Sequence, residues 1–195
     1  MIERTLVILK PDAVQRMLVG DVIQRFEKAG LKIIGMKMVW PSEELAGKHY
    51  TDDPAYLDEV GEKATASAKE RGQELTQTPR EVGESIRQKN MIFLNSGPVI
   101  VFVLEGNTAV AAVRNIIGGT NPLSADVGSI RGDLTIDDFS QADAEDRTCR
   151  NLIHASDSPE NGEQEIALWF DEGELHDYQT VMDKVLHDPN WGGKA

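Results

Sequence analysis

The chain is poor in cysteine and in positive charge, and it has no long apolar segment. Cys149 is the one cysteine among 195 residues, so no intrachain disulfide can form and a reducing cytoplasm is expected. The flanking Arg147 and Arg150 could lower the pKa of its thiol, although the simpler interpretation is that this cysteine is incidental. No apolar run approaches the roughly 20 residues that a membrane helix needs. The first residues also lack the charged-then-apolar pattern of a signal peptide, so we expect a cytoplasmic protein with no membrane partner.

Acidic residues outnumber basic ones by 33 to 20, and the formal net charge is −13. Binding along a nucleic-acid backbone usually requires a basic face, so this balance argues against a nucleic-acid partner. A small phosphate ligand is not excluded, because it needs only a few cations that converge locally. The length and the 40% of hydrophobic residues suit a single domain over residues 1–195.

Apolar periodicity predicts strands and helices in a defined order. The continuous apolar run 98–104 is the clearest strand, and it is expected to lie at the centre of a sheet. The expected strands are 5–9, 31–40, 98–104 and 151–154, and the main expected helices are 19–29, 42–50, 107–117 (capped by Asn107), 159–170 and 174–186. This order suits an α+β, ferredoxin-like βαββαβ fold, in which a four-stranded antiparallel sheet has helices on one face.

Two segments differ from the rest of the chain. Residues 51–90 are rich in Glu, Lys, Ala and Gln, and they predict two surface helices at about 54–71 and 80–90. Residues 120–134 form a loop with Gly and Pro, of a length that usually carries function. One or two helical turns are expected at 142–147.

The segment from Asn151 to Ser158 places His154 between apolar strand residues and short polar residues. Histidine is a nucleophile near neutral pH, and an imidazole that faces a phosphate site could carry a phosphoryl group covalently. The simpler interpretation is a hydrogen-bonded core histidine. Neither a G-x-x-x-x-G-K-[ST] loop nor a G-x-G-x-x-G motif is present, so a nucleotide would have to be held in another way.

Other polar residues are candidates for phosphate binding. Lys10 ends the first strand, Arg114 lies on a helix, Thr120 follows that helix, and Arg131 lies in the long loop. Each cation also has a simpler interpretation. Lys10 could merely end a strand, Arg114 could be solvated, and Arg131 could pair with Asp133.

Several motifs stand in a characteristic order over about 1–50 and 96–170. They are Glu3-Arg-Thr-Leu-Val-Ile-Leu-Lys10-Pro-Asp12, Ser96-Gly-Pro-Val99, Glu105-Gly106, Arg114 with Gly118 and Thr120-Asn-Pro122, Ile130-Arg-Gly-Asp133, Asn151-Leu-Ile-His154-Ala-Ser-Asp-Ser158 and Glu165-Ile-Ala-Leu-Trp-Phe170. Together they closely resemble the nucleoside diphosphate kinase family. The histidine segment followed by the Glu-Ile-x-Leu-Trp-Phe helix is the most specific of these signals.

The resemblance implies a ping-pong kinase. His154 would take the γ-phosphate of a nucleoside triphosphate, typically ATP, and pass it from a phosphohistidine to a nucleoside diphosphate. Glu165 matches the carboxylate that hydrogen-bonds the other imidazole nitrogen, and Tyr50 matches a tyrosine beside the histidine. Such phosphoryl transfer depends mainly on positioning and on charge neutralisation.

The resemblance also implies the nucleotide contacts. Lys10 would contact the sugar hydroxyl and the transferring phosphoryl group, Asn151 would hold the ribose, and the residues that hold phosphates would be Arg114, Thr120 and Arg131. The implied cofactor is Mg²⁺ on the donor phosphates, which Asp157 could reach through water. The family assembles into homo-oligomers, so a homo-oligomer is expected here.

The chain departs from the family in its insertions, at about 51–90 and 135–148. Family members carry a base-stacking phenylalanine where this chain has Ile86-Arg87, and a loop proline where it has Val127. Three rival hypotheses are a catalytically weak regulatory relative, a nucleic-acid-binding ferredoxin-like module and a structural oligomer subunit. The first would be marked by loss of His154 or of the cations, the second lacks strand-borne aromatics and basic charge, and the retained polar residues argue against the third.

Overall fold

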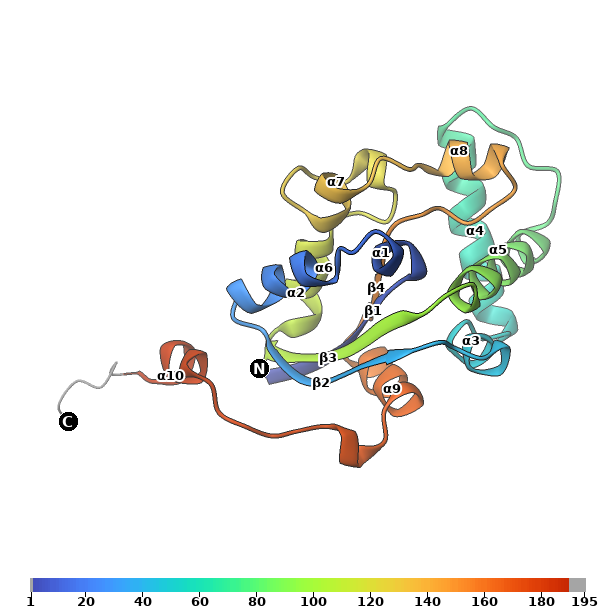
Figure 1. Ribbon diagram of the computed structural model, residues 1–195. Coiled ribbons are helices and arrows are strands. Elements are labelled where there is room, and N and C mark those ends of the chain that lie inside the picture. Colours follow the sequence, from blue (N-terminus) through green and yellow to red (C-terminus); the bar gives the residue numbers. More distant parts are fainter. Residues whose placement is uncertain (1, 190–195) are drawn as a thin grey trace.

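Four strands form one antiparallel sheet in the order β2-β3-β1-β4 (Figure 1). The structure, a computed structural model, describes residues 2–189. Its strands are β1 (Ile2–Leu9), β2 (Lys32–Val39), β3 (Val99–Asn107) and β4 (Ile153–Ala155). β1 and β3 pair along their whole length, and the short β4 pairs with the end of β1. The predicted α+β, ferredoxin-like arrangement is confirmed.

Helices begin mostly where capping residues predict them. Ser42 accepts a hydrogen bond from the backbone of Leu45, and Ser158 accepts one from Asn161 with Pro159 in the first turn. The helices are α1 (Pro11–Gln15), α2 (Val19–Lys28), α3 (Glu43–His49), α4 (Pro54–Glu70), α5 (Pro79–Asn95), α6 (Ala109–Ile117), α7 (Ile130–Leu134), α8 (Phe139–Ala144), α9 (Pro159–Trp169) and α10 (Val181–His187), with 3-10 turns η1 (Pro122–Ser124) and η2 (Glu172–Glu174).

Helices cover both faces of the sheet, so the expectation of one covered face is wrong. One core lies between the sheet and α2 and α6, and it contains Val7 and Leu9. A second core lies between the opposite face and α3, α5 and α9, and it contains Leu6 and Ile8. Successive side chains of a strand point to opposite faces, so the continuous apolar run 6–9 of β1 must be covered on both.

The helices α4 and α5 pack against each other through glycines. A Cβ on Gly61 would lie 1.7 Å from the carbonyl oxygen of Pro79, and one on Gly83 would lie 2.0 Å from that of Leu57. Only glycine allows such a close backbone approach. The two helices predicted within 51–90 are therefore present, and α5 continues beyond this range to Asn95.

Four local expectations need correction. Asn107 is the last residue of β3, and Thr108 is the N-cap of α6. The expected loop 120–134 contains η1 and α7, because Ser129 caps a short helix by accepting from the backbone of Gly132. The last helix begins at Val181 rather than at 174, since the preceding segment is extended. The helical turns expected at 142–147 lie slightly earlier, in α8.

The segment after α9 lies along the outer strand β2. The backbone nitrogen of His176 donates to the carbonyl of Ile34 at 2.7 Å, and the Tyr178 hydroxyl donates to the carbonyl of Ile33 at 2.6 Å. This segment therefore occupies the first half of the β2 edge. In the part of the chain that the structure describes, no helix is long and apolar enough to cross a membrane.

Candidate active site

One cleft of about 1510 Å³ lies at the meeting point of β4, α3, α4, α6 and α7. All the residues that the sequence proposes for the site line it, although they come from distant parts of the chain: Lys10, Tyr50, Arg114, Thr120, Arg131, Asn151, His154, Asp157 and Glu165. The volume is sufficient for a nucleotide, since pockets for drug-sized ligands are usually about 300–1,000 Å³.

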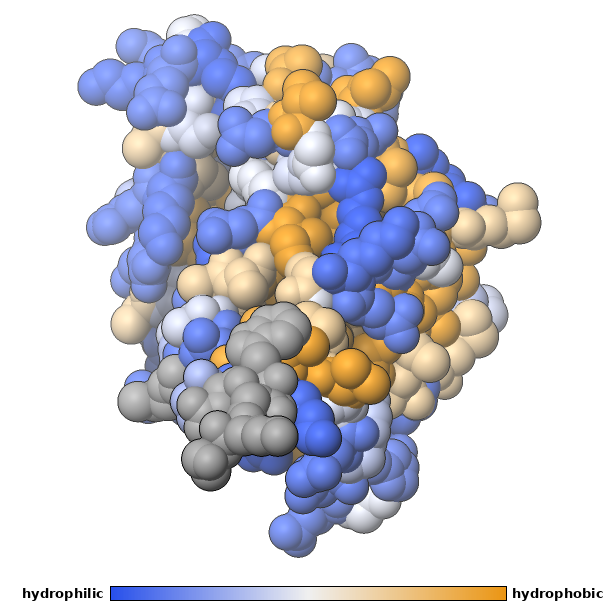
Figure 2. All heavy atoms as spheres, turned by 90° about the vertical axis from the view of Figure 1, so that its left-hand side faces the viewer, coloured by the Kyte–Doolittle hydropathy of each residue, from blue (hydrophilic) through white to orange (hydrophobic). Residues whose placement is uncertain are grey.

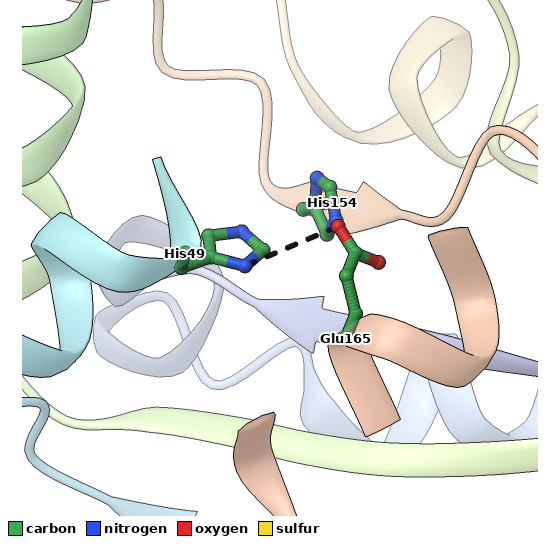
Figure 3. A group of neighbouring side chains, drawn as sticks. All are labelled: His49, His154 and Glu165. Atoms are coloured by element: carbon green, nitrogen blue, oxygen red, sulfur yellow. Dashed lines mark hydrogen bonds and ion pairs between the residues drawn. The ribbon is translucent and has the colours of Figure 1, made fainter. Parts of the chain in front are cut away.

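His154 lies on β4 and is held by a carboxylate from α9 (Figure 3). Its Nε2 is 2.8 Å from Oε1 of Glu165, and the other carboxylate oxygen accepts a 2.6 Å hydrogen bond from the hydroxyl of Ser156. An ionised carboxylate can only accept, so Nε2 carries the proton. The lone pair therefore resides on Nδ1, for which the described residues provide no hydrogen-bond donor.

The carboxylate of Glu165 is ionised at any physiological pH. Burial alone would raise its pKa, but the electrostatic interaction with His154 and the hydrogen bonds from His154 and Ser156 lower the pKa of Glu165 to about 2. Ser156 is itself fully buried, and its oxygen also accepts from the backbone nitrogen of Leu6 at 3.1 Å. Sequence reasoning assigned no role to Ser156, although it lies two residues after His154.

His49, at the end of α3, is a second residue that sequence reasoning missed. Its ring stands edge-on to the ring of His154, with centroids 4.6 Å apart, and its Nδ1 is 4.0 Å from Oε1 of Glu165 (Figure 3). Burial and the charge of His154 lower the pKa of His49 to about 3, so His49 remains neutral. Its Nδ1 accepts from the indole of Trp169 at 3.4 Å. A neutral, buried ring at this place restricts the orientation of the His154 imidazole.

Tyr50 packs on His49, with ring centroids 4.8 Å apart. Within residues 2–189, the ring contact with His154 is thus made by His49, and Tyr50 supports it from behind. Burial raises the pKa of the Tyr50 phenol above its ordinary value, so it remains neutral. Tyr50 lines the same cleft as His154.

A buried network connects four of the predicted nucleotide-binding residues. The Nζ of Lys10 donates to the side-chain oxygen of Asn151 at 2.8 Å, and the amide nitrogen of Asn151 donates to the carbonyl of Thr120 at 3.0 Å. Arg131 donates to the carbonyls of Asn151, Gly118 and Ile153. The cations are thereby fixed by neutral acceptors, and neither of them is neutralised by a salt bridge among the described residues.

Burial lowers the pKa of both cations, and their mutual repulsion contributes. The pKa of Lys10 falls to about 8, first because of burial and then because of the nearby Arg131. The pKa of Arg131 falls to about 10, through burial and then through Arg114. Two buried positive charges without a counter-ion constitute an environment that favours an anionic ligand.

The backbone is strained where this network meets β4. Leu152 has a φ of 67°, and the nitrogen of Ile153 donates to the carbonyl of Asn151 at 2.8 Å, which closes a γ-turn. Asp12 accepts from the nitrogen of Leu152, and the carbonyl of Leu152 accepts from the backbone nitrogen of Lys10. A non-glycine residue in this region is uncommon, and such strain often accompanies functional sites.

Arg114 and Thr120 lie at the exposed edge of the cleft, on and just after α6. Asp157 is also exposed, and its Oδ1 accepts a 2.6 Å hydrogen bond from Asn161. These positions leave Arg114 and Asp157 free to face a ligand that enters the cleft. The carboxylate oxygens of Asp157 are of the kind that Mg²⁺ prefers, unlike the His49, His154 and Glu165 group, which contains two imidazoles.

The structure decides two alternatives about charge that the sequence left open. Cys149 is buried, and burial together with the charge of Asp137 raises the pKa of its thiol to about 12, although arginines flank it in sequence. Asp133 does not pair with Arg131. It forms a 2.7 Å ion pair with Arg25 instead, because the side chain of Arg131 turns into the network of carbonyl groups.

Comparisons with known proteins agree with this geometry. A model of the family described as nucleoside diphosphate kinase matches residues 3–57 and 77–175. The nucleoside diphosphate kinase of Pyrobaculum aerophilum is 46% identical over 179 residues, which cover 89% of this chain and 98% of that protein. The chloroplastic nucleoside diphosphate kinase 2 of Nicotiana tabacum is 40% identical over 185 residues, which cover 95% of this chain and 63% of that protein.

Solved structures lead to the same family. An NDP kinase from Pyrobaculum aerophilum superposes with a TM-score of 0.86 at 44% identity, over 91% of this chain and 100% of that chain. A transition-state mimic of the nucleoside-diphosphate kinase from Borrelia burgdorferi, with bound vanadate and ADP, has a TM-score of 0.78 at 32% identity, over 94% and 96% of the two chains.

The fold and the site define a phosphotransferase that acts on nucleotides. The chain belongs to the nucleoside diphosphate kinase family. The family, the fold and the enzyme class predicted from the sequence are thus confirmed. Enzymes of this family bind nucleotides and need a divalent cation.

Proposed function

We propose that this chain transfers the γ-phosphoryl group of a nucleoside triphosphate, typically ATP, to a nucleoside diphosphate, with Nδ1 of His154 as the nucleophile. One observation carries the proposal. The Nε2 nitrogen of His154 is bonded to Glu165, while Nδ1 is left with its lone pair in a cleft that also contains buried Lys10 and Arg131.

The reaction has two half-steps with the same chemistry. In the first, Nδ1 of His154 attacks the γ-phosphorus, a P–N bond forms, the P–O bond to the β-phosphate breaks, and the diphosphate leaves. In the second, a β-phosphate oxygen of another nucleoside diphosphate attacks the same phosphorus and the P–N bond breaks. The imidazole becomes positively charged when it is phosphorylated, and the carboxylate of Glu165 stabilises that charge.

The remaining residues bind and orient the nucleotide. Lys10 and Arg131 face the equatorial oxygens of the transferring group, where negative charge accumulates. Arg114 and Thr120 hold the other phosphates at the edge of the cleft, and Asn151 orients the ribose through the amide that already bonds Lys10. Tyr50 supports His49 and thereby the plane of the His154 ring.

The cofactor that we propose is Mg²⁺, held by the donor phosphates and reached by Asp157 through water. Mg²⁺ is commonly bound by one or two carboxylates together with substrate phosphates. Asp157 fits this requirement because it is an exposed carboxylate that lines the cleft. The ion would supply additional positive charge to the phosphates when it is bound.

A label-transfer experiment tests the function. Incubation with γ-labelled ATP and Mg²⁺ is expected to produce an acid-labile, base-stable label on the protein, which an added nucleoside diphosphate then removes as labelled triphosphate. The variant His154→Ala is expected to lose both steps while its circular dichroism remains unchanged. Label or turnover above a few per cent in a folded His154→Ala protein would show that another residue is the nucleophile.

We also propose that the chain acts as a homo-oligomer. β2 is an outer strand of the sheet, and its second half shows no backbone hydrogen bond to the C-terminal segment among the described residues. It carries Met36 and Met38 with 54% and 60% exposure, followed by Trp40 with 66%. Exposed apolar residues on an edge strand favour association with another chain. Figure 2 shows that hydrophobic residues gather on the side of the molecule seen from the left of Figure 1. Light scattering of Met38→Glu is expected to show dissociation, and an unchanged mass would exclude this edge.

We further propose that the protein is cytoplasmic. We also propose that residues 1–195 form a single domain with insertions at about 51–90 and 135–148. The buried, unpaired thiol of Cys149 supports a reducing compartment. The family model leaves residues 58–76 unmatched, which supports an insertion within the first range. Fractionation of the cells that make the protein tests the location.

A further inference from the structure

The cations of the proposed mechanism occupy only one part of the cleft. Lys10 and Arg131 lie beside the Asn151 segment, close to β4. A nucleotide carries its base at the end remote from the transferring phosphate, so another part of the cleft must receive the base. The lining continues from Asn151 to both insertions, and there it includes Arg71 after α4 and Phe139 at the start of α8.

Hydrogen bonds place Phe139 on the wall that begins at Asn151. The carboxylate of Asp137 accepts from the backbone nitrogen of Arg150 and from Arg147, both at 2.6 Å. The hydroxyl of Thr135 donates to the carbonyl of Arg150 at 3.1 Å. The segment that leads to Phe139 is thus tied to the residues directly before Asn151, and α8 lies farther from β4 along the same wall (Figure 1).

The ring of Phe139 is supported by an arginine from the other insertion. The guanidinium carbon of Arg71 lies 5.8 Å from the ring centroid of Phe139. Arg71 is held in place by a 2.8 Å ion pair with Asp143 and by a 2.7 Å hydrogen bond to Ser67. A second ion pair, between Lys89 and Asp146, also joins the two insertions, at 2.7 Å. These contacts fix the ring of Phe139 and the guanidinium of Arg71 beside each other at this end of the cleft.

Tyr56 is the other aromatic side chain of the cleft outside the group around His154. Burial raises the pKa of Tyr56, and the carboxylates of Glu165 and Asp157 raise it further. Both carboxylates lie around the nucleophile, and Tyr56 lines the cleft near them, so it belongs to the phosphate end of the cleft. Phe139 is therefore the better placed of the two for the base.

We propose that Phe139, supported by Arg71, is the surface on which the nucleobase of the substrate stacks. The inference rests on the proposed kinase function and names the part of the site that receives the base. Every base has a π-face, and stacking on an aromatic ring contributes about 1–3 kcal/mol per base with little selectivity. A ring surface without paired hydrogen-bonding groups accordingly accepts purines and pyrimidines, with purines held more tightly.

Steady-state kinetics of Phe139→Ala tests the proposal. The KM for ADP is expected to rise about tenfold, which corresponds to about 1.4 kcal/mol, while kcat stays within about twofold. Phe139→Tyr, which keeps the ring, is expected to retain the wild-type KM, and Phe139→Leu, which keeps the volume without the ring, is expected to resemble Phe139→Ala. The rise is expected to be larger for ADP than for UDP.

Matched controls separate stacking from a structural effect. Ile136→Ala changes an apolar residue of the same segment that is 94% exposed and does not line the cleft, so its KM is expected to remain unchanged. Thermal unfolding of all variants reports on the fold. An unchanged KM in a folded Phe139→Ala protein, or a KM rise caused by Tyr56→Ala and not by Phe139→Ala, would overturn the inference.

A binding measurement keeps the test independent of catalysis. Phe139→Trp introduces a fluorophore at the site, and ADP is expected to quench it beyond the change seen in the wild-type protein. If the wild-type protein shows no phosphotransfer, the kinase function is refuted but the stacking proposal is not. Quenching of Phe139→Trp by ADP would still show whether the base contacts this ring. Active protein without additional quenching would refute the stacking alone.

Discussion

The buried ammonium group of Lys10 is expected to set how the activity decreases at alkaline pH. Its pKa of about 8, against an ordinary 10.5, means that its environment disfavours the charged form by about 3 kcal/mol. Below pH 8 the group is charged and can bind the transferring phosphoryl group. As the pH rises through 8, the free enzyme loses this charge, so kcat/KM is expected to decrease about tenfold per pH unit.

Lys10 is expected to have a different pKa when a nucleotide is bound. Phosphate oxygens beside Lys10 favour its charged form, so the pKa rises when a nucleotide binds, and kcat is expected to decrease only at a higher pH than kcat/KM does. Of the groups around Lys10, Arg131 has a pKa of about 10 and Cys149 one of about 12, so neither titrates in the same range. The assay is steady-state phosphotransfer at saturating and at low ADP between pH 6.5 and 9.5.

A loss of folding stability at alkaline pH does not account for the expected decrease in kcat/KM. The unfolded chain binds more protons at Lys10 than the folded chain between pH 8 and 10.5, so the contribution of Lys10 to stability increases with pH in that range. The control is Lys10→Arg, whose guanidinium remains charged, and it is expected to lose the alkaline decrease. A flat kcat/KM profile up to pH 9.5, or the same decrease in Lys10→Arg, would refute the reasoning.

Three further predictions concern positioning, packing and the insertion. Glu165→Gln is expected to lower kcat about 10- to 100-fold in the phosphotransfer assay, because a hydrogen bond to a charged group contributes about 1.5–3 kcal/mol; an unchanged kcat would show that the carboxylate is not needed. Gly83→Ala is expected to lower the free energy of unfolding, measured in urea, by about 1–3 kcal/mol, because the new Cβ would lie 2.0 Å from the carbonyl oxygen of Leu57. Gly20→Ala is the control: its Cβ would meet nothing within 4 Å, so it should not destabilise the protein. Hydrogen exchange is expected to show increased protection of the amides of α4 when ADP binds, and no change would place the insertion outside the nucleotide site.

Much of the fold could be predicted because contiguous residues encode it. The apolar runs of β1 and β3 identify two central strands, and Ser42 and Ser158 mark helix starts through hydrogen bonds to the next turn. The extent of helix coverage could not be predicted from strand order alone. A chain with two fully apolar strands needs cover on both faces, and long-range packing decides which helices supply it.

The sequence by itself determined the chemistry: a histidine beside short polar residues, a carboxylate on the following helix, and several cations in a fixed order. Only the tertiary structure decided how they act. It brings Lys10 to Asn151, 141 positions away, places His49 against His154, and buries Cys149 so that its pKa rises instead of falling. The physical reason is that side-chain identity is local, whereas distance, burial and electrostatic environment depend on parts of the chain that meet only after folding.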